Sequence, residues 1–195
     1  KTANELELKG VEVTYIKPDQ NGIINCNEIK GAIKENTKLV SVMHVNNETG
    51  RIQPIKKLLE ICQFYKVVFH SDMVQALGKI PIHLDKWSES GLSMASFSAH
   101  KIGGPPGVGA LWVTAGRQVK KLIKGGGQEK GRRSGTENIY GIAGFGAAAK
   151  SVANWQSHAK NWTEWRSNFV LKLQRAYPEI QVTTRDAECV NNTIS

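Results

Sequence analysis

The sequence contains little cysteine, and its three residues of this type, Cys26, Cys62 and Cys189, are widely spaced. No two of them form a CxxC pair, so we predict neither a metal site nor a disulfide framework. A reducing compartment fits this pattern best. Cys62 falls on the apolar face of a predicted helix, where we expect it to be buried.

Long hydrophobic runs are absent as well. No stretch of about 18 apolar residues occurs, so no transmembrane helix and no membrane partner are expected. The chain begins at Lys1, without an initiator methionine and without a signal-peptide pattern. We therefore expect an internal piece of a longer protein that is not secreted.

Acidic residues are in the minority: 17 Asp and Glu stand against 26 Lys and Arg, a net charge of +9. Such an excess raises the question of an anionic partner. The basic residues are scattered, and neither zinc-finger spacing nor an RNA-binding aromatic motif accompanies them, so no nucleic-acid partner is expected. A solvated basic surface is the plainer interpretation, beside binding of an anionic cofactor or an acidic protein.

What the sequence does contain is enough apolar material, 40% of its residues, for one core or one core and the start of a second. Strand and helix patterns alternate over the first 115 or so residues. Such alternation favours an α/β sheet covered by helices on both faces. The expected strands are 11–15, 39–44, 67–71, 92–97 and 110–114, and the expected helices are 28–35 and 54–65.

The last third of the chain has a different pattern. A glycine-rich stretch runs from Gly125–Gly127 to Gly135. Helical patterns follow at 138–154 and 161–175, and residues 180–183 are expected to start a strand of another domain.

Polar side chains follow three of the expected strands. In open α/β sheets, ligands bind beyond the carboxyl ends of the strands, so these side chains could converge on one crevice. They are Asn47 after strand 39–44, Asp72 and Gln75 after strand 67–71, and Ser98, His100 and Lys101 after strand 92–97.

Pyridoxal phosphate (PLP) chemistry requires such a set of groups. An amine must bind the aldehyde, a carboxylate must keep the ring nitrogen protonated, and donors must hold the phenolic oxygen and the phosphate. The suitable residues are Lys101 for the aldehyde, Asp72 for the ring nitrogen, Asn47 or Gln75 for the phenolic oxygen, and Ser98, His100 and Thr136 for the phosphate.

Each of these residues also has a plainer interpretation. A single aspartate at a strand end, such as Asp72, is more often a turn former or a helix cap. A single lysine in a glycine-rich loop, such as Lys101, is usually solvated. Asn46–Asn47 could simply form a turn, and Gly135–Thr136 could cap the helix that follows. The order and spacing of the whole set nevertheless favour the cofactor site.

The sequence resembles the cysteine desulfurase family, PLP enzymes of the class V aminotransferase fold. Four segments carry the resemblance, in the family's order and at near-family spacing, and it covers nearly the whole chain. They are MHVNNETG at 43–50, HSDMVQALGK at 70–79, SFSAHK at 96–101 followed by GVGAL at 107–111, and GGGQE at 125–129 followed by RSGTEN at 133–138.

The resemblance implies roles for the same residues, with Lys101 as the Schiff-base lysine, Asp72 at the ring nitrogen, Asn47 and Gln75 near the phenolic oxygen, and Ser98 and His100 at the phosphate. Thr136 matches a threonine that reaches the phosphate of the neighbouring subunit, which implies a homodimer with shared sites. The implied domains are 1–154, part of the PLP-binding large domain, and 155–195, the incomplete start of a small C-terminal domain.

The implied reaction removes sulfur from L-cysteine, giving L-alanine and an enzyme persulfide. The RSGTEN form favours the iron–sulfur branch, in which a scaffold protein or another acceptor receives the sulfur, in a bacterial cytoplasm or a mitochondrial matrix. The family's ring-stacking histidine is expected before Lys1, and its nucleophilic cysteine and substrate-binding arginine after Ser195. A selenocysteine lyase, another class V aminotransferase and a non-catalytic fragment remain alternatives.

Overall fold

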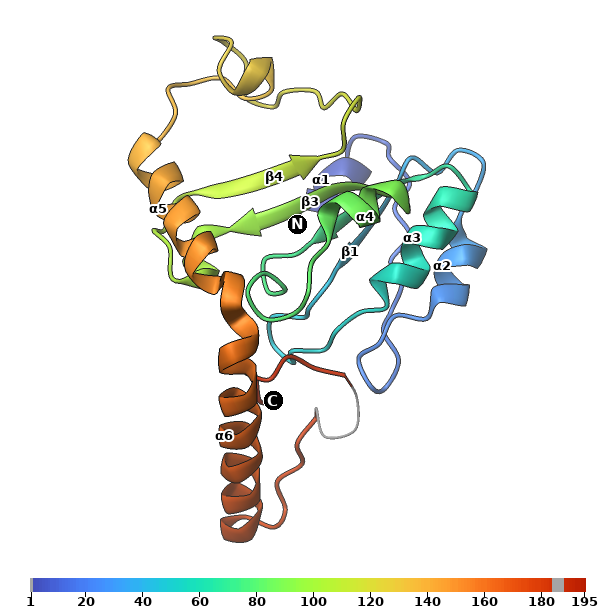
Figure 1. The fold of residues 1–195 in the computed structure, drawn as a ribbon. Coiled ribbons are helices and arrows are strands. Elements are labelled where there is room, and N and C mark those ends of the chain that lie inside the picture. Colours follow the sequence, from blue (N-terminus) through green and yellow to red (C-terminus); the bar gives the residue numbers. More distant parts are fainter. Residues whose placement is uncertain (1, 184–187) are drawn as a thin grey trace.

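A four-stranded sheet forms the centre of the protein, whose computed structural model describes residues 2–183 and 188–195 (Figure 1). Its strands, in spatial order, are β1 (Leu39–Met43), β2 (Val68–Asp72), β3 (Leu92–Ser98) and β4 (Gly109–Val113). β1, β2 and β3 are parallel, and β4 is antiparallel to β3. Four strands expected from the sequence are thus confirmed, and so is the mainly parallel α/β class.

Helices α3 (Ile55–Phe64) and α4 (Leu84–Glu89) pack against one face of this sheet, and α2 (Cys26–Ala32) packs against α3. α3 and α4 connect neighbouring parallel strands, and such crossovers are almost always right-handed. Because the strand order advances in one direction from β1 to β3, both crossover helices fall on the same face. α4 was not expected from the sequence, since six residues carry too little periodicity to be recognised.

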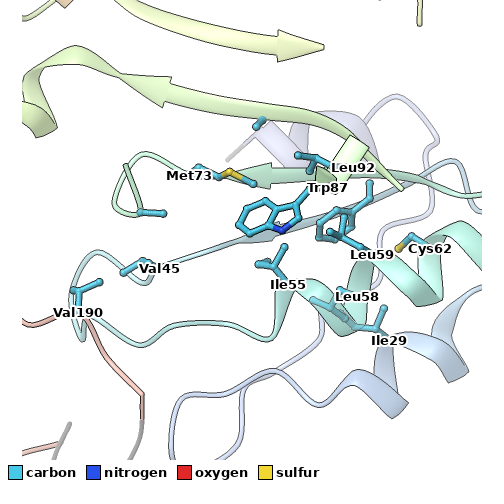
Figure 2. Packing of buried hydrophobic residues seen from close by; sticks show 13 residues of the cluster. Ile29, Val45, Ile55, Leu58, Leu59, Cys62, Met73, Trp87, Leu92 and Val190 are labelled. Atoms are coloured by element: carbon cyan, nitrogen blue, oxygen red, sulfur yellow. The ribbon is translucent and has the colours of Figure 1, made fainter. Parts of the chain in front are cut away.

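The core lies between this face and the helices (Figure 2). The expected apolar face of α3, formed by Ile55, Leu58, Leu59 and Cys62, is at most 2% exposed. Burying one such aliphatic side chain stabilises the fold by about 1.5–3 kcal/mol. Burial also raises the pKa of the Cys62 thiol to about 11, as suits a core residue. The same cluster contains Ile29 of α2, Phe69 of β2, Trp87 of α4 and Leu92 of β3.

The opposite face of the sheet is more open. Leu39 and Met43 of β1 are 48% and 39% exposed, and Leu111 of β4 is 51% exposed. The expectation of helices covering both faces is therefore wrong for these strands. Its physical reason is the one-directional strand order, which places every β–α–β crossover on the core face.

The N-terminal segment differs from expectation too. Residues 11–15 form no strand, because no neighbouring strand in the described part of the chain offers them a ladder of hydrogen bonds. The Tyr15 hydroxyl instead lies 2.8 Å from Asn4 Oδ1 and 2.9 Å from Glu7 Oε2, which ties the segment to α1 (Thr2–Glu7).

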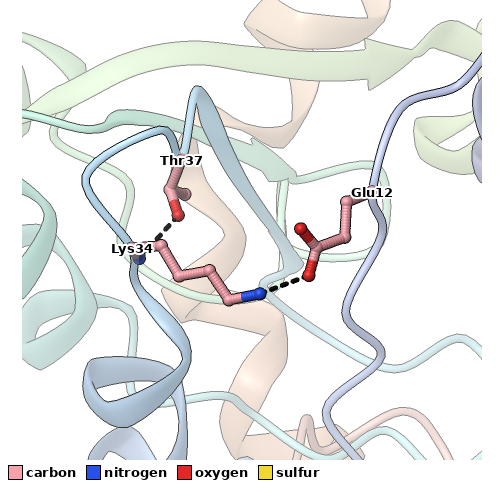
Figure 3. A network of polar contacts seen from close by, with 3 residues as sticks. All are labelled: Glu12, Lys34 and Thr37. Carbon is pink, nitrogen blue, oxygen red and sulfur yellow. Dashed lines mark hydrogen bonds and ion pairs between the residues drawn. The ribbon is translucent and has the colours of Figure 1, made fainter.

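A small polar network joins this segment to the loop before β1 (Figure 3). Lys34 forms an ion pair with Glu12, and its backbone N–H donates to Thr37 Oγ1 at 2.8 Å. Both charged side chains are exposed, so the ion pair contributes little to stability.

The last third of the described chain is helical. It comprises α5 (Ile139–Ser151), the single turn η3 (Val152–Asn154) and α6 (Trp155–Ala176), so α6 begins six residues before the expected position. No helix among the described residues is long and apolar enough to cross a membrane. The expected domain boundary after residue 154 stays a prediction.

The C-terminal segment 188–195 pairs with the loop between β1 and α3. The Val190 N–H donates to the Gly50 carbonyl at 2.9 Å, and the Ile52 N–H donates to the Glu188 carbonyl at 3.1 Å. Val190 is buried in the core cluster. Residues 180–183 form no strand, and the Thr183 N–H donates to the Ser195 carbonyl at 2.8 Å.

His44 is a buried polar residue of the core face, directly after β1. It is 6% exposed, its ring meets that of Trp87 edge-on at 5.4 Å, and its Nδ1 has no hydrogen-bond partner among the described residues. Burial lowers the pKa of His44 to about 4. The ring is therefore neutral in the folded protein near neutral pH.

Because His44 is buried in its neutral form, we predict that the free energy of unfolding falls in acid. The unfolded chain takes up a proton on His44 below pH 6.5, whereas the folded chain does so only near pH 4. The stabilisation is thus fully present above pH 6.5 and is lost as the pH falls toward 4, by up to about 3 kcal/mol.

Urea unfolding of the purified protein at a series of pH values measures this loss. His44→Phe keeps a ring of similar size beside Trp87 and removes the titration, so its stability should fall less between pH 6.5 and 4. Parallel curves for the two proteins would show that His44 is not the titrating group.

Candidate functional site

The carboxyl ends of the parallel strands carry the expected polar side chains. In the observed register Met43 of β1 pairs with Asp72, and Asp72 pairs with Ser96 of β3. Side chains of paired residues share a face, so Asp72 and Ser96 lie on the open face of the sheet. Ser98, two residues further along β3, lies on that face too. The register thus gathers a carboxylate and two hydroxyls at one edge.

Lys101 follows β3 within a single turn, η1 (Ala99–Ile102). Ala99 and Ile102 are buried, whereas His100 and Lys101 are exposed. The turn ends at Gly103, whose φ of +82° is a conformation that side chains disfavour. The buried ends of the turn hold its middle, and with it Lys101, at the strand end.

Helix α5 supports η1 from behind. A Cβ on Gly104 would lie 3.0 Å from Ala99 Cβ and 3.2 Å from Ala148 Cβ, and one on Gly144 would lie 2.9 Å from the Pro105 ring. Glycine at these two positions therefore allows the backbones to approach closely. The turn η1, which carries Lys101, therefore packs against α5.

Ser98 and His100 already contact each other. Ser98 Oγ lies 2.8 Å from His100 Nδ1, and either atom can supply the shared proton. If Nδ1 supplies it, the Ser98 oxygen accepts and its own hydroxyl proton remains free to donate to an anion. The pair suits a phosphate.

Asp72 forms a turn as well as ending β2. Its Oδ1 accepts a hydrogen bond from the Val74 N–H at 2.9 Å, so the turn-forming interpretation is right for this oxygen. Within the described residues Oδ2 has no hydrogen-bond partner. His70, on the same face, contacts Ser41 Oγ through Nδ1 at 2.8 Å; burial lowers its pKa, and the Asp72 charge opposes that shift.

Gln75 follows in the same turn and contacts a lysine. Lys79 Nζ donates to Gln75 Oε1 at 2.5 Å, and both side chains are half-buried. Burial lowers the pKa of Lys79, and the positive charge of Lys101 lowers it further. Gln75 and Lys79 follow the carboxyl end of β2, and Lys101 follows the carboxyl end of the adjacent parallel strand β3.

Asn47 lies in the turn after β1. Its neighbour Asn46 forms that turn, because Asn46 Oδ1 accepts from the Glu48 and Thr49 N–H groups at 2.9 Å each. The turn interpretation therefore holds for Asn46. Asn47 itself is exposed and has no hydrogen bond to the described residues, so its amide is free to meet a ligand.

Thr136 is not brought to this edge by its own chain. The cap of α5 is Asn138, whose Oδ1 accepts from the Gly141 N–H at 3.0 Å, so the expectation that Gly135–Thr136 could cap this helix is wrong. η1 packs near Ala148, and at about 1.5 Å per residue roughly 14 Å of helix separates that point from the start of α5. Thr136 is exposed beyond that start.

Sequence reasoning missed Lys79 and His70. Both were within the HSDMVQALGK segment but were given no role. The spacing of four residues between Gln75 and Lys79 could have indicated their contact. The spacing of two residues between His70 and Asp72 could have indicated a shared sheet face.

The donor set fits PLP. An exposed amine, a carboxylate with one free oxygen, an amide and a hydroxyl–imidazole pair meet at the carboxyl edge of a parallel sheet. Each has a counterpart among the groups of PLP, namely its aldehyde, ring nitrogen, phenolic oxygen and phosphate. These groups are Lys101, Asp72, Gln75, and Ser98 with His100.

Several known proteins are similar to this chain in sequence and in structure. The cysteine desulfurase IscS of Dictyoglomus turgidum is 37% identical over 191 residues, which cover 97% of this chain and 48% of that protein. A solved NifS-like protein matches 99% of this chain and 52% of its own, at 37% identity and a TM-score of 0.93. A structure of SspA in complex with cysteine matches 76% of this chain and 43% of its own, at 38% identity and a TM-score of 0.73.

The chain thus spans about half the length of the relatives that it matches. The profile of the aminotransferase class-V family matches residues 1–195, the whole length of the sequence. The four ordered segments, the parallel sheet and the polar groups at its carboxyl edge agree with that match. The chain belongs to the class V aminotransferase family.

Proposed function

We propose that the protein containing this chain is a PLP-dependent cysteine desulfurase. The observation that carries the proposal is the meeting of Asp72, Gln75, Ser98 and Lys101 at one edge of the sheet. The similarity to a cysteine desulfurase over 97% of the chain supports it. A related solved structure, of SspA, is described as a complex with cysteine.

Different residues of this chain would hold different groups of the cofactor. Lys101 Nζ would hold its aldehyde, and the free carboxylate oxygen of Asp72 would pair with its ring nitrogen. The amides of Asn47 and Gln75 donate to its phenolic oxygen. Ser98 and His100 hold its phosphate, and Thr136 does so from the neighbouring subunit.

Lys101 also moves protons. With the cofactor and L-cysteine bound, Lys101 Nζ would act as general base or general acid at the α and β carbons of the substrate. Asp72 keeps a proton on the ring nitrogen by ion pairing. The bound cofactor supplies an electron sink for the α carbon.

The sulfur-accepting thiolate is proposed to lie outside these 195 residues. Cys62 is buried in the core, and Cys26 is the first residue of α2, with its pKa raised chiefly by burial. Cys189 forms a backbone bridge with Arg51. The thiolate attacks the substrate sulfur: an S–S bond forms as the C–S bond breaks, and the β carbon takes a proton to give alanine.

The wider assignments are proposals too. The persulfide passes to an iron–sulfur scaffold protein or another acceptor, and the protein is a homodimer whose sites are shared. It acts in a bacterial cytoplasm or a mitochondrial matrix. Residues 1–154 belong to the large domain, and residues 155–195 begin the small one.

Replacing Lys101 tests the covalent attachment. The purified full-length protein should be yellow, and borohydride should abolish its imine absorption band. Lys101→Ala should abolish the covalent bond and leave at most weak PLP binding, whereas Lys86→Ala, an exposed lysine of α4, should change neither. A borohydride-trapped adduct on another lysine of Lys101→Ala would overturn the assignment.

Replacing Asp72 tests the electron sink. Asp72→Asn should lower turnover of L-cysteine by about 10²-fold or more, because about 3 kcal/mol of barrier stabilisation is lost with the charge on the ring nitrogen. Turnover is measured as alanine plus sulfide. Unchanged turnover would refute the role of Asp72, and a keto acid without sulfide would indicate an aminotransferase instead.

Replacing Thr136 tests the shared site. Thr136→Ala should weaken PLP retention and leave the melting temperature of the apo-protein unchanged. Asn138→Ala is the matched control, since loss of this helix cap should cost about 1 kcal/mol with or without cofactor.

Mixed subunits extend the test. Heterodimers of Lys101→Ala and Thr136→Ala subunits should contain one intact site, which recovers PLP binding lost in each parent. Full PLP affinity in Thr136→Ala, together with a monomeric protein, would contradict shared sites.

A further inference from the structure

The turn after β2 holds Gln75 and Lys79 rigidly. The Leu77 N–H donates to the Met73 carbonyl at 3.1 Å, and the Ile80 N–H donates to the Ala76 carbonyl at 3.1 Å. Met73 and Ala76 are completely buried. The backbone of residues 73–80 is therefore fixed on the same scaffold as Asp72.

Gly78 fixes the same turn from its far side. It has a φ of +72°, and a Cβ there would lie 2.9 Å from Val152 Cβ, at the end of α5. This close approach presses the turn against the helical layer that also supports η1. The relative positions of Gln75, Lys79 and Lys101 are thus set by two elements that share one support.

The contact between Lys79 and Gln75 selects one orientation of the glutamine amide. An ammonium group can only donate, so Oε1 must be the Gln75 atom that faces Lys79 Nζ at 2.5 Å. The Nε2 group then faces away with both N–H bonds free to donate. A free glutamine side chain would present either end.

The surroundings of Lys79 stabilise this orientation of the Gln75 amide. No carboxylate within the described residues forms an ion pair with Lys79, and among these residues Gln75 Oε1 is its one side-chain acceptor. The ammonium is half-buried, and burial and the charge of Lys101 both lower its pKa. Losing the amide acceptor would leave a half-buried cation poorly solvated, which holds Oε1 in place.

We propose that Lys79 is a positioning residue that orients the Gln75 amide so that its N–H groups face the phenolic oxygen of the cofactor. This inference rests on the proposed function, because it needs PLP at the edge beside Lys101. The opposite orientation would set Oε1 against an oxygen that carries negative charge. Lys79 therefore decides whether Gln75 attracts or repels that oxygen.

A double-mutant cycle tests the inference. Apo-protein of the wild type, Lys79→Met, Gln75→Ala and the double variant is titrated with PLP, and the absorption band of the bound cofactor is followed against pH. Lys79→Met should raise the apparent dissociation constant by roughly 10-fold to 150-fold, the range for one hydrogen bond to a charged group. It should move the pH midpoint of the band in the same direction as Gln75→Ala does.

The double variant gives the sharpest result. Since Lys79 acts through Gln75, Lys79→Met should have no further effect on affinity or on the band in the Gln75→Ala protein. Lys79→Arg should restore both readouts, because it also only donates. Lys86→Met, which removes a lysine on the exposed side of α4, should leave both at the wild-type values.

The outcomes separate this inference from the proposed function. Additive effects of Lys79→Met and Gln75→Ala in a protein that binds PLP at Lys101 would overturn the inference alone. Failure of the wild-type protein to bind PLP at Lys101 would overturn both. If Lys79→Met does not fold, Lys79→Gln replaces it: its amide can accept as well as donate and leaves the Gln75 orientation open, so the same non-additivity is expected.

Discussion

The register in which β2 pairs with its two parallel neighbours is the constraint on which the candidate site depends. It aligns Met43, Asp72 and Ser96 across three strands and gives them one face. A slip of one residue in β2 would turn Asp72 into the core and Phe69 out of it. Because Phe69 is completely buried, the hydrophobic core sets the position of the proposed catalytic carboxylate.

One face of the sheet packs the hydrophobic core, and the other face carries polar groups of the candidate site. The crossover helices α3 and α4 fall on one face and bury the apolar side chains there. The open face and the carboxyl edge keep the polar groups, each fixed by a different support: Asp72 by the strand, Lys101 by η1 on α5, and Gln75 by Lys79. Rigid elements thus hold side chains that are themselves accessible to a ligand.

Much of this arrangement was predictable from the sequence, because strands β1 to β4 and helix α3 are each specified by local periodicity. The positions of Asp72 and Lys101 at strand ends followed directly. The expected strands 11–15 and 180–183 were wrong because a strand needs a partner, which periodicity does not report. The orientation of the Gln75 amide depends on a side-chain contact, and the openness of one face depends on strand order, so neither could be seen in local patterns.

A crystal structure of the full-length protein grown with PLP tests the central claim most directly. The account predicts electron density that continues from Lys101 Nζ into the cofactor, with the Asp72 carboxylate within hydrogen-bond distance of the ring nitrogen. It also predicts that Ser98 and His100 contact the phosphate. PLP attached to a different lysine, or bound away from the carboxyl edge of β2 and β3, would contradict it.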